Sequence, residues 1–114
     1  MKLLLDKITR AELQAMAQSL FGNMVKAVVD VDKNLVVLDA ELHSDEESFL
    51  LERGSRQQDL WGINLYPEFP HDDGNFVEFD SMINLRPMGN NKSRSVDDPK
   101  IRARILEIVR QWVE

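Results

Sequence analysis

Apolar residues recur at helical spacing near both ends of the chain. The first run follows Thr9, and Glu12 three residues later completes a capping box, in which both side chains satisfy backbone N–H groups at a helix start. Asp98 and Pro99 suit the start of a second helix, because aspartate caps helices and proline fits the first turn. The apolar positions of the two runs are Leu13, Met16, Ala17, Leu20, Ile101, Ile105, Ile108, Val109 and Trp112. This spacing predicts an N-terminal and a C-terminal helix.

Between these runs the pattern changes to the alternation that is typical of β-strands. The expected strands cover residues 1–5, 24–31, 35–38, 60–66 and 76–85, and the third could continue to His43. Residues 44–47 form another capping pattern, and residues 48–53 fit either a helix or a strand. We favour one helical turn followed by a strand over residues 49–52.

Short turns rather than crossover helices join these strands, which indicates antiparallel pairing. The sequence therefore predicts an α+β fold with a mostly antiparallel sheet of about five strands. The N-terminal and C-terminal helices are expected to pack on one face of this sheet. The 114 residues, of which 43% are apolar, can build one core, so we expect a single domain over residues 1–114.

Composition narrows the function classes. The chain has no cysteine, which excludes disulfides, thiolate zinc sites and cysteine nucleophiles. No apolar run approaches the length of a membrane span, so we expect a soluble, cytoplasmic protein without membrane contact. The net charge of −6 argues against general nucleic-acid binding. Half of the lysines and arginines lie after residue 84, so the sequence is compatible with a local basic surface near the C-terminus.

Three stretches carry a resemblance to a known family. They are residues 41–43, residues 54–62 with Asp59-Leu60-Trp61-Gly62, and residues 83–99 with Asn84-Leu85-Arg86-Pro87, Asn90, Asn91 and Asp98-Pro99. Together they resemble a family of short prokaryotic proteins described only as a domain of unknown function. The resemblance covers nearly the whole chain and implies a single-domain prokaryotic protein. It implies no activity, cofactor or catalytic residue.

Glu41 and His43 are the first candidates for chemistry. If the strand that begins at residue 35 continued this far, the two side chains would share one face. A carboxylate beside a histidine orients a general base or supplies part of a metal site. Two ligands do not make a metal site, so we predict none. The alternative is a polar strand end that leads into a capped turn.

The loop over residues 86–94 is the second candidate. Its side chains that suit a small anion are Arg86, Asn90, Asn91, Ser93 and Arg94. Arginine binds phosphate and carboxylate groups with two parallel hydrogen bonds, and the loop leads to a helix start, where free N–H groups collect. The loop lacks the spacing of a phosphate-binding P-loop, and acidic residues at the helix start would repel an anion. The alternative is an ordinary polar connection.

Trp61 and Gly62 leave two interpretations open. Trp61 is either a core aromatic residue or an exposed residue that stacks on a partner. Gly62 would permit a β-bulge that turns the indole ring outward.

These observations favour a non-catalytic binding or regulatory module that recognises a small anion, a nucleotide or a partner protein. The alternative is a small hydrolase or nuclease-like enzyme with His43 as general base, assisted by Glu41 and Arg86. A third hypothesis is that the chain is a component of a toxin–antitoxin-type pair. Exposed strand edges are also compatible with a homodimer. The sequence identifies no cofactor.

Overall fold

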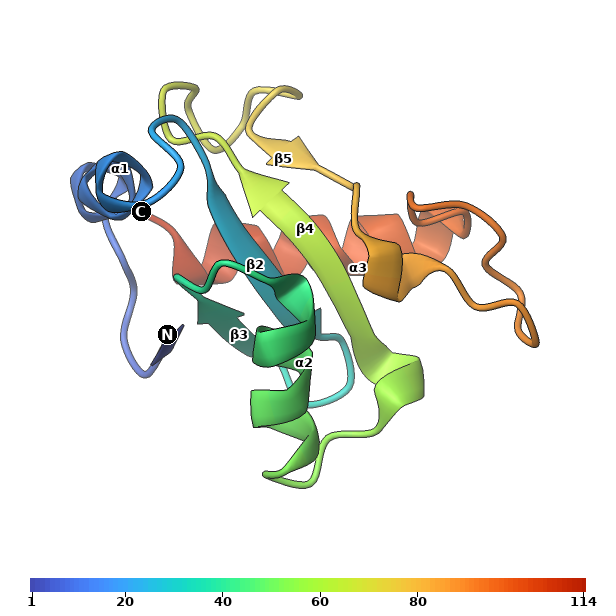
Figure 1. Cartoon of the computed structure of the whole chain (residues 1–114). Helices are drawn as coiled ribbons and strands as arrows, with labels where there is room; N and C mark the ends of the chain where they lie inside the picture. The colour runs from blue at the N-terminus through green and yellow to red at the C-terminus, as the bar shows by residue number, and fades with distance from the viewer.

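The structure is a computed structural model that describes residues 1–114, and it contains one five-stranded antiparallel sheet (Figure 1). The strand order is β1-β3-β2-β4-β5, and the strands are β1 (Lys2–Leu3), β2 (Val25–Asp30), β3 (Leu35–Leu38), β4 (Leu60–Leu65) and β5 (Val77–Glu78). The helices are α1 (Arg10–Ser19), α2 (His43–Leu51) and α3 (Pro99–Trp112), with 3₁₀ turns η1 (Gln57–Asp59) and η2 (Met82–Asn84). The predicted α+β fold is confirmed.

Helices α1 and α3 pack on one face of the sheet, as the sequence predicts (Figure 1). The Thr9 side chain caps α1 by accepting a hydrogen bond from the Glu12 backbone N–H at 3.1 Å. Asp98 caps α3 through the Lys100 backbone N–H at 2.8 Å. Their apolar sides enclose a large cluster of 18 buried apolar residues, to which Leu13, Ala17, Ile63, Ile105, Ile108 and Val109 belong.

The other face of the sheet carries a much smaller apolar cluster. Alternation along β2 places Ala27 and Val29 in the large cluster and Val28 on the opposite face. There Val28 packs with Val37, Leu50 and Leu60, and these four residues form the small cluster. Leu50 comes from α2, which lies across this face (Figure 1).

Helix α2 corrects the expected strand over residues 49–52. The chain is one continuous helix from His43 to Leu51, and its buried positions His43, Glu46 and Leu50 follow helical spacing. Two of these three side chains are polar, so the apolar pattern alone did not show the helical period. The helix forms because the second face of the sheet must be covered, and tertiary packing overrides weak local preference.

Strand β3 covers Leu35–Leu38 as predicted, and its possible continuation to His43 does not form, because Asp39 adopts a left-handed backbone conformation with φ of 71° and turns the chain. Two other strand predictions are too long. Strand β1 covers only Lys2–Leu3 of the expected residues 1–5. Strand β5 covers only Val77–Glu78, and η2 replaces the expected strand end near residue 83.

The possible bulge at Gly62 is also wrong. Gly62 keeps a regular register opposite Val28.

None of the three helices combines the length and the apolar character needed to cross a membrane.

Candidate functional sites

Side chains rather than a strand complete one edge of β4. Strand β4 pairs with β2 along its whole length, but on its other side β5 pairs only with Asn64 and Leu65, so the first half of β4 has no strand on that side. The Asn84 amide fills this place: its Oδ1 accepts from Gly62 N–H and its Nδ2 donates to Gly62 C=O, both at 2.9 Å. The blocks around residues 59–62 and 84–87 therefore meet in space, and an edge that could pair with another chain is closed.

Arg86 closes the same edge beside Asn84. Its Nη1 donates to the Gln58 carbonyl at 3.0 Å, and its Nη2 donates to the Leu60 carbonyl. The guanidinium carbon lies 3.7 Å from the centroid of the Trp61 ring, which is a cation–π stack. Burial lowers the pKa of Arg86 from its ordinary value, although the negative charge of Glu47 opposes this effect. An arginine side chain keeps its proton in proteins, so Arg86 is a cation. Its Nη1 and Nη2 already bind backbone carbonyls.

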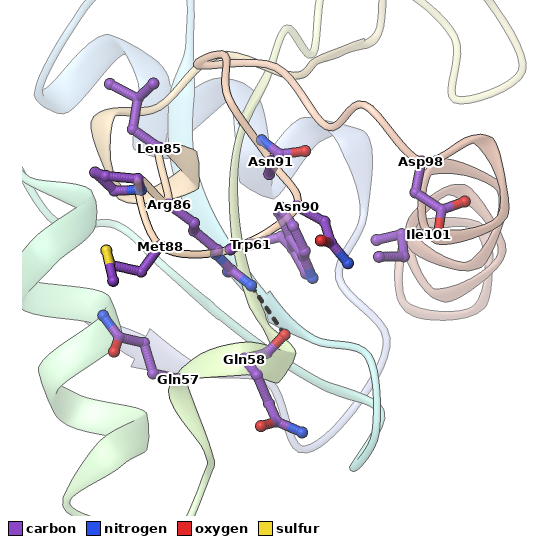
Figure 2. A pocket seen from close by; sticks show the side chains of 12 residues that line it. Gln57, Gln58, Trp61, Leu85, Arg86, Met88, Asn90, Asn91, Asp98 and Ile101 are labelled. Atoms are coloured by element: carbon purple, nitrogen blue, oxygen red, sulfur yellow. Dashed lines mark hydrogen bonds between the residues drawn. The ribbon is translucent and has the colours of Figure 1, made fainter.

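A cavity of about 700 Å³ opens between this stack and α3, and we call it the Trp61 cavity (Figure 2). Its lining consists of Gln57, Gln58, Trp61, Leu85, Arg86, Pro87, Met88, Gly89, Asn90, Asn91, Asp98 and Ile101. Trp61 is only 4% exposed and belongs to the large cluster, so the interpretation of Trp61 as a core residue is confirmed. The indole Nε1–H and the Arg86 Nε–H are both buried, and neither has a hydrogen-bond partner.

Asn91 shapes the loop that walls this cavity. Its buried Nδ2 lies 2.9 Å from the Asn84 carbonyl, 3.0 Å from that of Ser93 and 2.6 Å from that of Ser95. Its Oδ1 accepts from the Asp97 N–H at 2.7 Å. Every polar atom of the Asn91 side chain is thus used within the loop.

Ser93 also serves the loop itself. Its hydroxyl donates to Asp97 Oδ1 at 2.6 Å and accepts from the Ser95 N–H at 3.1 Å. The Ser93 hydroxyl and the Lys92 backbone N–H, which both donate to the Asp97 carboxylate, hold its pKa below the usual value. Ser93 lines neither of the cavities described in this section.

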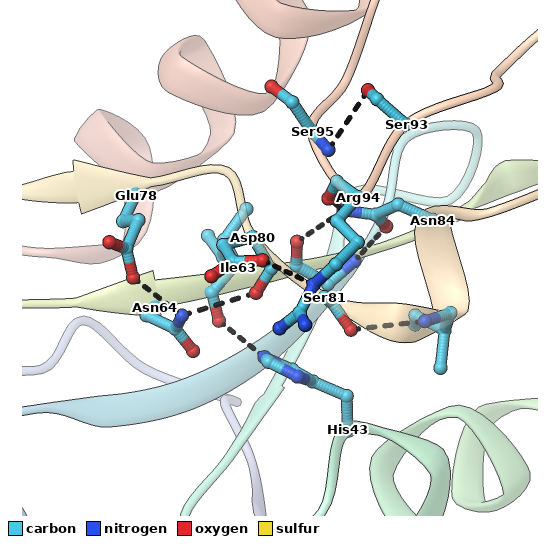
Figure 3. A network of polar contacts seen from close by, with 12 residues as sticks. His43, Ile63, Asn64, Glu78, Asp80, Ser81, Asn84, Ser93, Arg94 and Ser95 are labelled. Carbon is cyan, nitrogen blue, oxygen red and sulfur yellow. Dashed lines mark hydrogen bonds and ion pairs between the residues drawn. The ribbon is translucent and has the colours of Figure 1, made fainter.

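A second cavity, of about 470 Å³, lies on the α2 face of the sheet, and we call it the His43 cavity (Figure 3). Its lining consists of Met24, Lys26, Leu42, His43, Ser44, Asn64, Tyr66, Glu78, Asp80, Ser81, Met82, Ile83 and Arg94. The Arg94 Nε forms an ion pair with Asp80 Oδ1 at 2.7 Å. Arg94 therefore belongs to this cavity and not to the one beside Arg86.

His43 is 8% exposed and is held by one hydrogen bond of 2.8 Å between its Nε2 and the Ile63 carbonyl. A carbonyl oxygen only accepts, so Nε2 carries the hydrogen and Nδ1 of the neutral ring keeps its lone pair. Burial is the main cause that lowers the pKa of His43, which favours the neutral ring at pH 7. No hydrogen bond of the protein reaches Nδ1.

The structure divides the candidate residues between two places. Arg86, Asn90 and Asn91 line the Trp61 cavity, whereas His43 and Arg94 line the His43 cavity, and the two linings share no residue. Glu41 is exposed in the bend before α2 and lines neither cavity. The expected strand that placed Glu41 beside His43 does not form, because His43 begins a helix.

Sequence reasoning missed several residues of these sites. Asn64, Glu78 and Asp80 enter the His43 cavity because β5 pairs beside β4, a contact that no local pattern reveals. Asn84 was visible only as part of the Asn-Leu-Arg-Pro block of the family resemblance.

Comparison with known proteins gives a family but no activity. The model of a family described as "Protein of unknown function (DUF5674)" matches residues 2–112. Neither the curated proteins nor the solved structures contain a match to the chain. The chemistry of the two cavities therefore carries the functional argument.

Proposed function

We propose that this chain, which belongs to the DUF5674 family of proteins of unknown function, is a non-catalytic module that binds a small anionic molecule in the Trp61 cavity. The observation that carries this proposal is the pair of buried donors without partners, Trp61 Nε1–H and Arg86 Nε–H. Each buried N–H that lacks an acceptor costs about 1–3 kcal/mol. A ligand oxygen that meets these donors would recover that free energy.

The positive charge of Arg86 favours a negatively charged ligand. No carboxylate of the protein lies within ion-pair distance of its guanidinium, so the positive charge is not neutralised by a direct partner. Because Nη1 and Nη2 bind the Gln58 and Leu60 carbonyls, the ligand would meet Nε and the field of the cation rather than a free fork. Asp98 lies on the α3 side of the cavity, so the anionic group is expected at the Arg86 end (Figure 2).

The size and rim of the cavity favour a ligand that has an uncharged polar and apolar part beside its charged group. A volume of about 700 Å³ falls within the range of small-molecule sites. Exposed amides of Gln57, Gln58 and Asn90 offer donors and acceptors around the rim, and Met88 and Ile101 offer apolar surface. A mononucleotide combines these features: a phosphate, a polar sugar and a planar base.

Amide and indole NMR tests this proposal directly. The chain has two tryptophans, so its ¹⁵N spectrum contains two indole N–H signals, which Trp112→Phe assigns. Titration with inorganic phosphate and AMP should shift the Trp61 indole signal and the backbone amides of residues 85, 86 and 88–91, since Pro87 has no N–H. The Trp112 indole already donates to the Asn34 carbonyl at 3.2 Å and should not move.

A pair of matched substitutions then tests the donor itself. Trp61→Phe removes the Nε1–H and keeps an aromatic ring, so the dissociation constant should rise about tenfold, the value of one hydrogen bond to a charged acceptor. Trp112→Phe makes the same chemical change outside the cavity and should leave affinity unchanged. Equal affinities in the two variants, or no shift with any ligand at millimolar concentration, would overturn the proposal.

A further inference from the structure

We infer that the Trp61 cavity selects a nucleotide whose base has two adjacent N–H donors, as guanine has, and that the Asp98 carboxylate accepts from them. This inference rests on the proposed function, because it names the ligand class of the same cavity. Arg86 and Asp98 line the cavity on opposite sides of Trp61 and Asn90 (Figure 2). The cavity therefore has a positive and a negative end, and a ligand that fills it needs a different group at each end.

Asp98 is the only carboxylate in the lining of this cavity. Its Oδ1 caps α3 by accepting from the Lys100 N–H at 2.8 Å, and no lysine or arginine lies within ion-pair distance of the side chain. A carboxylate has about four lone-pair positions, so one capping bond leaves acceptor positions on both oxygens. Because an ionised carboxylate only accepts, the ligand group at this end must supply the hydrogens.

The neighbouring Asp97 has a different role. Its Oδ1 accepts from the Ser93 hydroxyl at 2.6 Å and its Oδ2 from the Lys92 N–H at 3.0 Å, and it does not line the cavity. Both oxygens of Asp97 thus hold the loop, whereas one oxygen of Asp98 makes no hydrogen bond within the protein. The start of α3 therefore offers the cavity one carboxylate and not two.

The groups between the two ends suit a planar base. The Trp61 side chain is only 4% exposed, and its unpartnered Nε1–H is stabilised by an acceptor that a ligand brings. Asn90 is exposed, and its amide can donate to the carbonyl oxygen that stands beside N1–H in guanine. Ile101 lies next to Asp98 and provides apolar surface for the face of the base (Figure 2).

The pattern of donors distinguishes guanine from adenine at this end of the cavity. Guanine presents N1–H and a 2-amino group side by side, and a carboxylate can accept from both. Adenine presents one amino group beside N1, whose lone pair a carboxylate repels. Hypoxanthine keeps N1–H but has no 2-amino group. We therefore expect GMP to bind about tenfold more tightly than AMP, with IMP between them.

The experiment titrates the intact chain with inorganic phosphate, AMP, IMP and GMP and follows its ¹⁵N NMR spectrum. Phosphate should shift the Trp61 indole signal and the Arg86 amide, but not the amides of Lys100 and Ile101. GMP should shift all four signals, because its base reaches the Asp98 end. The four dissociation constants should follow the order GMP, IMP, AMP and phosphate, from tightest to weakest.

Asp98→Asn tests the carboxylate itself. Asparagine also caps helices, so α3 keeps its start, and the spectrum of the unliganded variant checks this. The dissociation constant of GMP should rise about tenfold, whereas that of phosphate should not rise, because a negative charge leaves the cavity. Asp72→Asn makes the same chemical change at an exposed position outside the cavity and should alter both constants less than twofold.

The outcomes separate this inference from the proposed function. Equal affinities for GMP and AMP, or an equal effect of the two substitutions on GMP binding, would overturn the inference alone, since the cavity would still bind an anion. Failure of phosphate and of all three nucleotides to bind at millimolar concentration would overturn the proposed function and the inference together.

Discussion

The two faces of the sheet bury different kinds of side chain. The face covered by α1 and α3 holds the large cluster of 18 buried apolar residues, in which Trp61 alone has a polar side-chain atom without a partner. The face beneath α2 holds four buried apolar residues, and beside them lie the buried side chains of His43, Glu46, Asn64 and Asn84. Apolar burial is non-directional, whereas each buried polar group needs a partner in a fixed place.

This difference shows where the protein buries polar groups that lack hydrogen-bond partners. The first face supplies most of the hydrophobic stabilisation and has one unpaired polar atom, the Trp61 Nε1–H, whereas the second face buries several polar side chains. Glu46 and Asn64 have buried oxygens without a hydrogen-bond donor, whereas the buried amides of Asn84 and Asn91 are fully used. Proteins depart from full polar satisfaction mainly at functional or strained sites. The comparison is sharpened by substitutions that separate satisfied from unsatisfied polar groups.

The largest effect is expected for Asn84→Ala. Asn84 bonds the N–H and C=O of Gly62 and the carbonyl of Arg94, all at 2.9 Å. The change leaves both groups of Gly62 without a partner, whereas the Arg94 carbonyl keeps the Ser81 N–H at 3.0 Å. We expect the free energy of unfolding to fall by about 4 kcal/mol, the sum of several unsatisfied buried groups. Urea unfolding followed by tryptophan fluorescence measures this loss.

Asn90→Ala is the matched control for that measurement. Asn90 is exposed, and its side chain makes no hydrogen bond within the protein. Its removal should change the free energy of unfolding by less than about 0.5 kcal/mol. Similar losses in the two variants would mean that Asn84 does not complete the edge of β4 through its side chain.

The local pattern of the sequence predicts the elements whose signals are local. The caps at Thr9 and Asp98 and the valine alternation of β2 all appear where they were expected. Only one turn of helix α2 was predicted, because His43 and Glu46 occupy two of its buried positions and interrupt the apolar period. The unusual polar character of the second face is thus also the reason why its helix is hard to predict.

The candidate sites were predictable as residues but not as an arrangement. Arg86, Asn90 and Asn91 do line one cavity, and whether they bind an anion stays a prediction. That Arg94 and His43 share another cavity depends on which strands are neighbours, and local patterns do not contain strand order. The use of Arg86 to bind the Leu60 carbonyl is likewise a long-range contact.

The next largest effect is expected for Glu46→Gln, as a gain in stability. Burial raises the pKa of the Glu46 carboxyl to about 9, although the Ala40 backbone and Lys26 oppose the shift. The unfolded chain releases this proton near its ordinary pKa of about 4.5, so the free energy of unfolding falls as the pH rises from there to about 9. Glutamine carries no charge at any pH, and the variant should be more stable by about 3 kcal/mol at pH 8.

Chemical denaturation of both proteins between pH 5 and pH 9 tests this expectation. The difference between them should shrink towards pH 5, where Glu46 is protonated in both states. His43, whose pKa is lowered by burial, reduces stability as the pH falls below about 6.5, and this contribution cancels because both proteins contain it. A difference that stays constant with pH would show that Glu46 does not hold its proton in the folded state.

The smallest of the three effects is expected for Gly62→Ala, which probes how closely the polar groups of the second face pack on the sheet. A Cβ at this position would lie 2.5 Å from both Cβ and Oγ of Ser81 and 3.2 Å from Cδ2 of His43. Overpacking of this kind costs about 2 kcal/mol. Gly74→Ala, where nothing lies within 4 Å, should cost less than about 0.5 kcal/mol, and urea unfolding measures both losses. The added methyl group must displace Ser81 or His43. A Gly62→Ala variant as stable as the native protein would mean that the second face is loosely packed against the sheet.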